Sequence, residues 1–339
     1  MNMFQKRKQK MRKVGFVLLI VVLITILYGL NTGSLKIAPF DVIKTLLGQG
    51  TDIWEMILFD YRLPRICITV LAGFGLGVAG ALFQGITRNP LADPGVLGIH
   101  AGAGVGLMIY MTYFTSLNTL PALTIPLFTF AGGIMAATLI MLFAYEKGKG
   151  LLPNRLLLVG IAIAAGFNAV TLYLSLQLDE KTYSFAASWL LGNIWGRDWI
   201  HVYALLPWII LLIPIVYMKS KTLNSFSLGD SLAMSIGTRV NYERIKLLGL
   251  AVALSCASVA MTGGIGFIGL VAPHIARRLV GPAHEYLLPI SGLVGVVILV
   301  LSDTIARSIF EPSAIPAGVI VSAIGAPYFL YLLFKAKKY

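Results

Sequence analysis

Long apolar runs alternate with short polar or glycine-rich connections along this chain, and ten of the runs approach the length of a membrane-crossing helix. A bilayer core about 30 Å thick requires roughly 20 apolar residues in helical geometry. The runs predict spanning helices at residues 14–30, 64–85, 96–114, 122–145, 154–175, 200–218, 245–262, 264–280, 288–306 and 316–334. Glycines and a proline interrupt the run at 264–280, so the pattern leaves open whether that helix is continuous, broken or re-entrant. The pattern predicts an all-α membrane protein.

The N-terminal segment is strongly basic and leads directly into the first apolar run. A cleaved signal peptide would end in a small-residue cleavage site, but this run continues through Tyr28, Gly29, Leu30 and Asn31 without one. We therefore expect the first helix to be retained. The expected organisation is a basic cytoplasmic tail at 1–13, one transmembrane domain at 14–334 with a cytoplasmic loop at about 220–243, and a cytoplasmic tail at 335–339.

Composition supports the membrane assignment, and the placement of charge predicts the orientation. The chain is 58% hydrophobic and 12% charged, whereas soluble domains are about 25% charged. Its mean hydropathy is +0.84. With the N-terminus inside, 20 of the 27 Lys and Arg fall on the inner side. The other seven are Lys36, Lys44, Arg62, Arg65, Lys181, Arg197 and Arg307. The positive-inside rule then places both termini in the cytoplasm, and the net charge of +13 is a topology signal rather than a nucleic-acid footprint.

The sequence carries little catalytic chemistry. Gly75, Gly77 and Gly80 form a G-x-G-x-x-G, but it lies inside an apolar run rather than after a strand. The sequence contains no G-x-x-x-x-G-K-[ST] phosphate loop and no cysteine or histidine cluster with metal-ligand spacing. We therefore expect no catalytic residues, no bound metal and no cofactor held by this chain.

Ionisable residues inside the runs are scarce, and such residues are costly and usually functional. His100 and Asp303 are the candidates. His100 suits either a hydrogen-bonded packing residue or a proton relay. A proton-coupled secondary transporter would want a chain of intramembrane carboxylates, and a membrane-embedded enzyme would want a nucleophile–base pair or a metal cluster. Both classes remain as alternatives with little support from the residues.

Small residues concentrate in two segments, AGFGLGVAGA at 72–81 and GIHAGAGVG at 98–106. Small residues spaced four apart let helix backbones approach closely in lipid. The same absence of side chains would also leave room for a bulky solute beside a translocation path. The residues assigned to packing or path are Gly73, Gly77, Gly80, Gln84, Gly98, Gly102 and Gly106.

Four stretches together resemble one family. They are RLPRI at 62–66, ALFQGITRNPLADPGVLGIHAGAGVG at 81–106, LGDSLAMSIGTRV at 228–240 and GGIGFIGLVAPHIARRLVG at 263–281. In this order they are similar to the FecCD-type permeases of iron-siderophore, haem and vitamin B12 ABC importers. The resemblance covers nearly the whole chain.

The resemblance implies a type II ABC importer permease fold in the cytoplasmic membrane of a bacterium. It implies a second permease subunit, two ATPase subunits that hold ATP and Mg²⁺, and an extracellular or periplasmic substrate-binding protein. A ferric siderophore is the expected substrate in transit, with vitamin B12 or haem as alternatives. The resemblance leaves open whether the permease dimer contains one kind of chain or two.

The segment at 228–237 is expected to be a short helix with an apolar face. Leu228, Leu232 and Ile236 are four apart, Asp230 lies near the favourable N-terminus, and Gly237 is a typical stop. The residue pattern alone suits an ordinary surface helix. The resemblance implies that it is the coupling helix that docks in a groove of the ATPase. The residues assigned to coupling are Leu228, Gly229, Asp230, Leu232, Ala233, Ser235, Ile236 and Gly237.

Three arginines, Arg62, Arg65 and Arg307, fall on the outer side. Long basic side chains at helix ends also snorkel to the interface, whereas the resemblance implies that these three receive acidic residues of the binding protein.

On the inner side, the sequence predicts a tight turn that includes Arg88, Asn89, Pro90, Asp93 and Pro94. Pro90 disfavours helical geometry at Asn89. This turn and the segment PHIARR at 273–278 are candidates for ATPase contact or an inner gate. The aromatic segment at 183–199 suits the membrane interface, and the resemblance adds a short helix there that gates the outer end of the path.

Overall fold

The computed structural model describes residues 3–32, 37–95, 98–114, 122–148, 150–309 and 315–336. Lys36, Lys149, Lys337 and Lys338 of the charge distribution, and residues 96–97 of the second family-like stretch, lie outside these ranges. The described elements are α1 (Met3–Asn31), α2 (Pro39–Leu46), α3 (Asp52–Glu55), the π-helical η1 (Met56–Arg62), α4 (Leu63–Thr87), α5 (Ile99–Tyr113), α6 (Thr124–Ala144), β1 (Tyr145–Glu146), β2 (Gly150–Leu151), α7 (Pro153–Ser175), α8 (Glu180–Leu190), α9 (Trp199–Met218), α10 (Ser220–Phe226), α11 (Asp230–Ser235), α12 (Val240–Thr262), α13 (Ile268–Val280), α14 (His284–Ser308) and α15 (Ala317–Ala336).

Each of the ten predicted runs corresponds to a helix, and the all-α membrane fold is confirmed. Among the described residues, eight helical segments are long and apolar enough to cross a membrane. The helices α5 and α13 fall short of that length, with 15 and 13 residues. The count of ten spans is therefore not confirmed. Helix α1 begins at Met3, so the basic segment before residue 14 continues the same helix.

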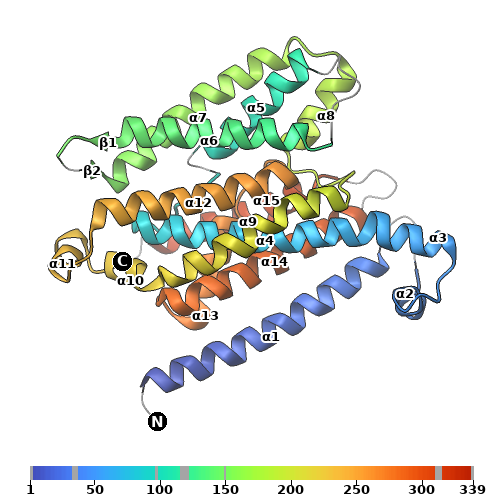
Figure 1. Cartoon of the computed structure of the whole chain (residues 1–339), viewed down its shortest axis with the longest axis horizontal. Coiled ribbons are helices and arrows are strands. Elements are labelled where there is room, and N and C mark those ends of the chain that lie inside the picture. Colours follow the sequence, from blue (N-terminus) through green and yellow to red (C-terminus); the bar gives the residue numbers. More distant parts are fainter. Residues whose placement is uncertain are drawn as a thin grey trace.

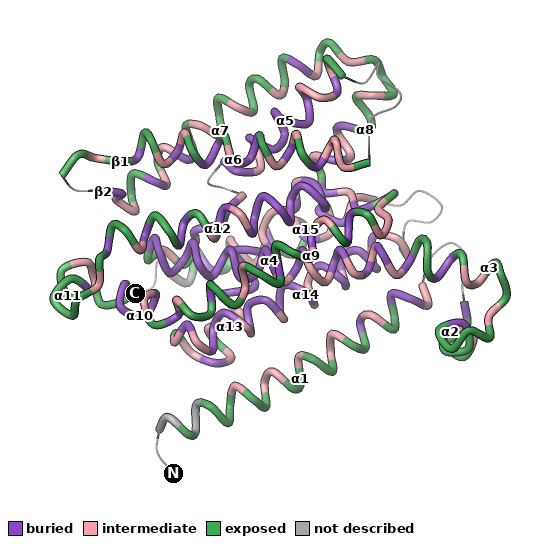
Figure 2. The backbone as a smooth tube through the Cα atoms, viewed as in Figure 1, coloured by how far each residue is buried: buried purple, intermediate pink, exposed green. Residues whose placement is uncertain are grey.

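The helices form a layered bundle around α4 (Figure 1). Helices α12, α13 and α14 pack on α4, while α5, α6 and α7 form a group on one side and α1 crosses the opposite side against α14. The central helices α4 and α14 are largely buried, whereas α1 and α7, which lie on opposite sides of the bundle, expose much of their length (Figure 2). The β-hairpin, α10 and α11 lie at one end of the bundle, and α2, α3 and α8 lie at the other (Figure 1).

Glycines bring the central helices into backbone contact. A Cβ added at Gly80 would lie 2.0 Å from the carbonyl oxygen of Gly269 in α13, and one added at Gly77 would lie 2.3 Å from that of Ser291 in α14. Gly73 makes the same kind of contact with Gly295. Real side chains do not approach this closely, so glycine is required wherever α4 crosses α13 and α14.

The run at 264–280 is broken rather than continuous. Helix α12 ends at Thr262, and α13 begins only at Ile268. Between them Gly263 has φ +78° and Phe267 has φ +66°. A bulky residue at positive φ is rare, and this one turns the chain so that a new helix N-terminus forms inside the bundle.

Several short elements were not predicted from the sequence. These are α2, α3, η1, α10 and the two-residue hairpin of β1 and β2. Helix α8 begins at Glu180 and ends at Leu190, so it overlaps the aromatic segment over residues 183–190. The side chain of Asp179 caps α8 by accepting hydrogen bonds from the backbone N–H groups of Lys181 and Thr182. The hydroxyl of Thr182 also donates to this carboxylate, and the pKa of Asp179 is lowered first by this side-chain bond and then by the backbone bonds.

Candidate functional site

Helix α11 is a six-residue helix bounded by glycines on both sides. Gly229 precedes it with φ +97°, and Gly237 follows it with φ +87°. The N–H of Thr238 donates to the carbonyl of Ala233 at 2.9 Å, and the N–H of Gly237 donates to that of Met234 at 2.9 Å. These bonds close the helix C-terminus as a left-handed glycine cap does, so the predicted helix and its stop are present. The helix begins at Asp230 rather than Leu228, because Gly229 is not helical, and Leu228 therefore lies outside it.

The outer face of α11 is apolar and uncovered. Leu228, Leu232 and Ile236 are 55%, 58% and 64% exposed, while Ala233 faces inwards and is fully buried. Met234 adds a fourth large apolar side chain at 58% exposure, and the sequence analysis did not include it. A contiguous set of exposed apolar residues on a short helix is typical of a protein–protein contact.

Asp230 links α11 to the rest of the bundle through two arginines. Its Oδ1 accepts a hydrogen bond from Arg88 at 2.8 Å and another from Arg244 at 2.8 Å. Arg244 is 1% exposed, donates to the carbonyl of Leu151 at 2.9 Å and lies over the ring of Phe226. Arg88 and Asp230, which are 142 residues apart and belong to two of the family-like stretches, thus meet in one ion pair. The sequence analysis did not identify Arg244 as a second partner of Asp230.

The predicted turn after α4 packs against α13. Arg88 ends α4 in left-handed geometry with φ +53°, and the side-chain oxygen of Asn89 accepts the N–H of Leu91 at 2.9 Å. Asp93 is 4% exposed, and its carboxylate lies against the first turn of α13, where a Cβ added at Gly269 would be 2.5 Å from Oδ1. Burial raises the pKa of Asp93 to about 6, against the opposing effect of the backbone N–H groups of Phe267 and Gly95.

Two more residues of this turn region serve packing. Pro94 lies against Gly269, where an added Cβ would be 2.9 Å from its ring. The amide nitrogen of Gln84 lies 3.4 Å and 3.3 Å from the carbonyls of Gly269 and Leu270, and its oxygen accepts from Arg277 at 3.3 Å. Gln84 therefore holds α13 against α4.

The glycines assigned to packing or path are packing residues in this structure. Besides the contacts of α4, Gly102 lies against the backbone of Gly132 and Gly106 against that of Phe128, so α5 and α6 are also in close contact. Gly98 adopts φ +90° ahead of α5, with the carbonyl of Gly160 in α7 3.0 Å from where its Cβ would be. None of these contacts leaves space for a solute at the glycine itself.

The open space lies beside the turn. A cavity of about 460 Å³ is lined by Asp93, Gly95, His100, Leu190, Leu191, Gly264, Gly266, Phe267, Gly318, Val319 and Ser322. It therefore lies between the predicted turn, the end of α8, the α12–α13 break and the start of α15. His100, a candidate from the sequence, lines this cavity.

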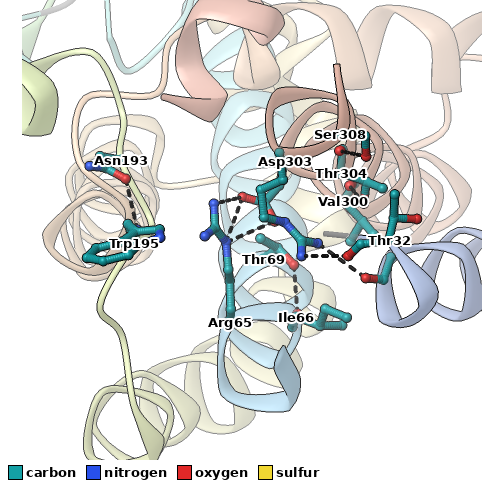
Figure 3. A network of polar contacts seen from close by, with 12 residues as sticks. Thr32, Arg65, Ile66, Thr69, Asn193, Trp195, Val300, Asp303, Thr304 and Ser308 are labelled. Carbon is teal, nitrogen blue, oxygen red and sulfur yellow. Dashed lines mark hydrogen bonds and ion pairs between the residues drawn. The ribbon is translucent and has the colours of Figure 1, made fainter. Parts of the chain in front are cut away.

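Two of the three outer arginines, Arg65 and Arg307, pair with Asp303, and Figure 3 shows Arg65 beside this carboxylate. The Nε of Arg65 lies 3.0 Å and 3.1 Å from the two carboxylate oxygens of Asp303, and one terminal nitrogen lies 2.7 Å from Oδ1. Arg307 pairs with the same carboxylate at 3.2 Å and donates to the carbonyls of Thr32 and Gly29. Arg62 donates to the carbonyl of Leu30.

The position of these arginines differs from the expectation of charges exposed at a helix mouth. Arg62 is 6% exposed, and the side chains of Arg65 and Arg307 are each 11% exposed. The physical reason is that Asp303 is buried in α14 and needs cationic partners, while the end of α1 leaves carbonyls that need donors. The cluster fastens α1 and α4 to α14. Arg65 and Arg307 share a single carboxylate, so one positive charge remains in excess.

Fold and site together define a polytopic α-helical integral membrane protein with an exposed short helix at one end of its bundle, an architecture that suits the membrane subunit of a transporter. The chain belongs to the FecCD transport family, whose family model matches residues 19–335. It is 44% identical over 327 residues to the iron(3+)-hydroxamate import system permease protein FhuG of Bacillus subtilis, covering 95% of this chain and 96% of the relative. It is 38% identical to the Fe(3+) dicitrate transport system permease protein FecD of Escherichia coli, covering 92% and 95%.

Solved structures show the same fold. A metal-chelate type ABC transporter in an inward-facing conformation matches with a TM-score of 0.83 and 29% identity, over 96% of this chain and 99% of the other. PsaBC from Streptococcus pneumoniae matches with a TM-score of 0.57 at 18% identity, over 86% and 94%, which shows likeness of fold alone.

Proposed function

We propose that this chain is the permease subunit of an ABC importer that carries ferric siderophores inward across the cytoplasmic membrane. The observation that carries the proposal is the uncovered apolar face of α11, held in place by Asp230 at one end of a membrane-embedded bundle. Family membership adds the transport class, and the relatives named for ferric hydroxamate and ferric dicitrate import favour a ferric chelate over vitamin B12 or haem.

In this proposal α11 docks in a groove of a separate ATPase chain, which binds ATP and Mg²⁺. Leu228, Leu232, Met234 and Ile236 would be the anchors, since a short helix that lays apolar residues into a groove is a common recognition mode. Two such ATPase subunits would serve a dimer of permeases. The end of the bundle with α11 would then be cytoplasmic, together with the basic N-terminal part of α1 and both termini.

The outer arginine cluster would receive the substrate-binding protein. Guanidinium groups suit bidentate pairing with carboxylates, and Arg65 and Arg307 leave one positive charge uncompensated by Asp303. An acidic residue of a docked partner would supply the missing negative charge. Because the arginines are largely buried, docking would involve a movement of the ends of α1 and η1 that cover them.

The substrate path would run beside the 460 Å³ cavity, with a second permease subunit completing it. Helix α7 is apolar and mostly uncovered in this chain, so lipid or a second subunit must shield it. A proton-coupled carrier finds less support, because Asp303 is paired with Arg65 and Arg307 rather than standing alone in a path.

The test is the uptake of radiolabelled iron, supplied as a panel of siderophores, in cells that lack the gene and in cells that carry it again. We expect ATP-dependent uptake of at least one siderophore to return with the wild-type chain and with the conservative variant Leu232→Met, but not with Leu232→Asp. Unchanged uptake of every ferric chelate in the deletion strain would overturn the siderophore assignment. Repeating the panel with haem and vitamin B12 would then decide between the remaining substrates.

A further inference from the structure

Three segments at the α11 end of the bundle meet at one oxygen atom. Oδ1 of Asp230 accepts one hydrogen bond from Arg88, at the end of α4, and a second from Arg244, in the first turns of α12. Arg244 also binds the carbonyl of Leu151 in β2. The position of the docking helix is therefore tied to the turn after α4 and, through Arg244, to the hairpin between α6 and α7.

The two ion pairs differ in how firmly they are held. Arg244 is enclosed by Phe226 and the hairpin and is 1% exposed at its side chain. Arg88 and Asp230 are 35% and 31% exposed, so their contact can open and close without burying an unpaired charge. Arg244 is thus the fixed partner of Asp230, and Arg88 is the adjustable one.

The turn that carries Arg88 also reaches the cavity. Five residues further on, the carboxylate of Asp93 lies against Gly269 in the first turn of α13, and both Asp93 and Phe267 line the 460 Å³ space. Asp230 thus contacts Arg88, and Arg88 is joined by a short stretch of chain to an acid in the cavity wall.

From this geometry we infer that Arg88 and Asp230 are positioning residues that couple the movement of α11 to the turn at 88–95 and hence to the wall of the cavity. The inference rests on the proposed function, because it assumes that a partner ATPase moves α11. It assigns the turn a role in transmission that does not require the turn to contact the ATPase itself.

The experiment uses the complete importer, with permeases, ATPase and binding protein, reconstituted in proteoliposomes. The measured quantity is the stimulation of ATP hydrolysis by the substrate-loaded binding protein, with ferric-chelate uptake recorded in parallel. The variants are Arg88→Gln, Arg88→Lys and Asp230→Asn. The matched control is Lys219→Gln, since Lys219 forms a 2.8 Å ion pair near the same end with Glu243 of α12, which belongs neither to α11 nor to the turn.

We expect Arg88→Gln and Asp230→Asn each to lower the stimulation at least about fivefold, the lower end of usual coupling between sites, while the ATPase still co-purifies with the permease. Arg88→Lys should restore most of it, because only one terminal nitrogen of Arg88 bonds to Asp230. The double variant Arg88→Gln with Asp230→Asn should fall no further than the worse single variant, since Asp230→Asn already weakens the contact that Arg88→Gln removes, in addition to the contact with Arg244.

Wild-type stimulation in Arg88→Gln, an equal loss in the Lys219→Gln control, or a fully additive double variant would each overturn the inference. If the importer with Arg88→Gln fails to assemble, the stimulation of ATP hydrolysis in Asp230→Asn provides a second measurement. Uptake by the wild-type importer is measured first, so that a failure of the proposed function is distinguished from a failure of the coupling role.

Discussion

The contact between Gly80 and Gly269 allows a direct test of the packing of α4. In the variant Gly80→Ala the new Cβ would lie 2.0 Å from the carbonyl oxygen of Gly269 and 2.3 Å from its Cα, whereas ordinary contact begins at 3.4 Å. The obstructing atoms are backbone, so no side-chain rotation relieves the clash. Helices α4 and α13 would have to separate by more than 1 Å at this point.

The size of the effect follows from two opposing contributions. Overpacking a tight interior costs about 1–3 kcal/mol, and a clash with rigid backbone belongs at the upper end. Alanine is better than glycine in a helix by about 1 kcal/mol. The expected net loss is about 2 kcal/mol, which is about a thirtyfold change in the folding equilibrium.

The assay is unfolding in mixed micelles with increasing denaturing detergent, followed by far-UV circular dichroism. The matched control is Gly249→Ala in α12, where nothing lies within 4 Å of the added Cβ. We expect the control to be unchanged or stabilised by up to about 1 kcal/mol. If Gly80→Ala unfolds at the same detergent fraction as Gly249→Ala, the close contact of α4 with α13 does not exist and the reasoning is refuted.

Three further outcomes are expected. Leu232→Asp places a charge on the apolar face of α11, so co-purification of the ATPase should be lost at an unchanged permease level; retained ATPase would contradict the docking role. Asp303→Asn leaves two buried arginines without their carboxylate and should destabilise the chain by about 3–5 kcal/mol in the same unfolding assay. The control Arg155→Gln breaks an exposed ion pair with Glu146 and should cost at most about 1 kcal/mol. Burial raises the pKa of Asp93 from 3.8 to about 6, so the folded state binds the carboxyl proton more tightly than the unfolded state. The contribution of Asp93 to the free energy of unfolding should therefore decline by about 3 kcal/mol as pH rises from about 4 to 6. The variant Asp93→Asn should abolish that decline.

The apolar runs were sufficient to predict the helices of the bundle, because in a bilayer each backbone polar group must be satisfied within its own segment. The spacing of Leu228, Leu232 and Ile236 likewise predicted a short helix with a glycine stop, which are local properties, but it did not predict that Gly229 leaves Leu228 outside α11. For α13, the sequence left open whether the helix is continuous, broken or re-entrant. Its start involves Phe267 at positive φ and the carboxylate of Asp93 packed against Gly269, which come from different parts of the chain.

The charged clusters could not be predicted from local pattern, because their members are far apart in sequence. Arg65 and Asp303 are separated by 238 residues, and the sequence analysis considered them separately, as a docking residue and an intramembrane acid. One signal was present: a buried carboxylate near the outer ends of the helices requires cations, and Arg62, Arg65 and Arg307 were the arginines assigned to that end. Arg244 gave no such signal, since its partners lie on three separate elements.

Helix α4 joins the two ends of the molecule mechanically. Its 25 residues correspond to a rod about 37 Å long, with Arg65 beside the outer cluster at one end and Arg88 beside Asp230 at the other. Gly73 and Gly77 place its backbone directly on that of α14, so no layer of side chains separates the two helices at these two contacts. A displacement of α4 there would carry α14 with it, and the two helices would move together.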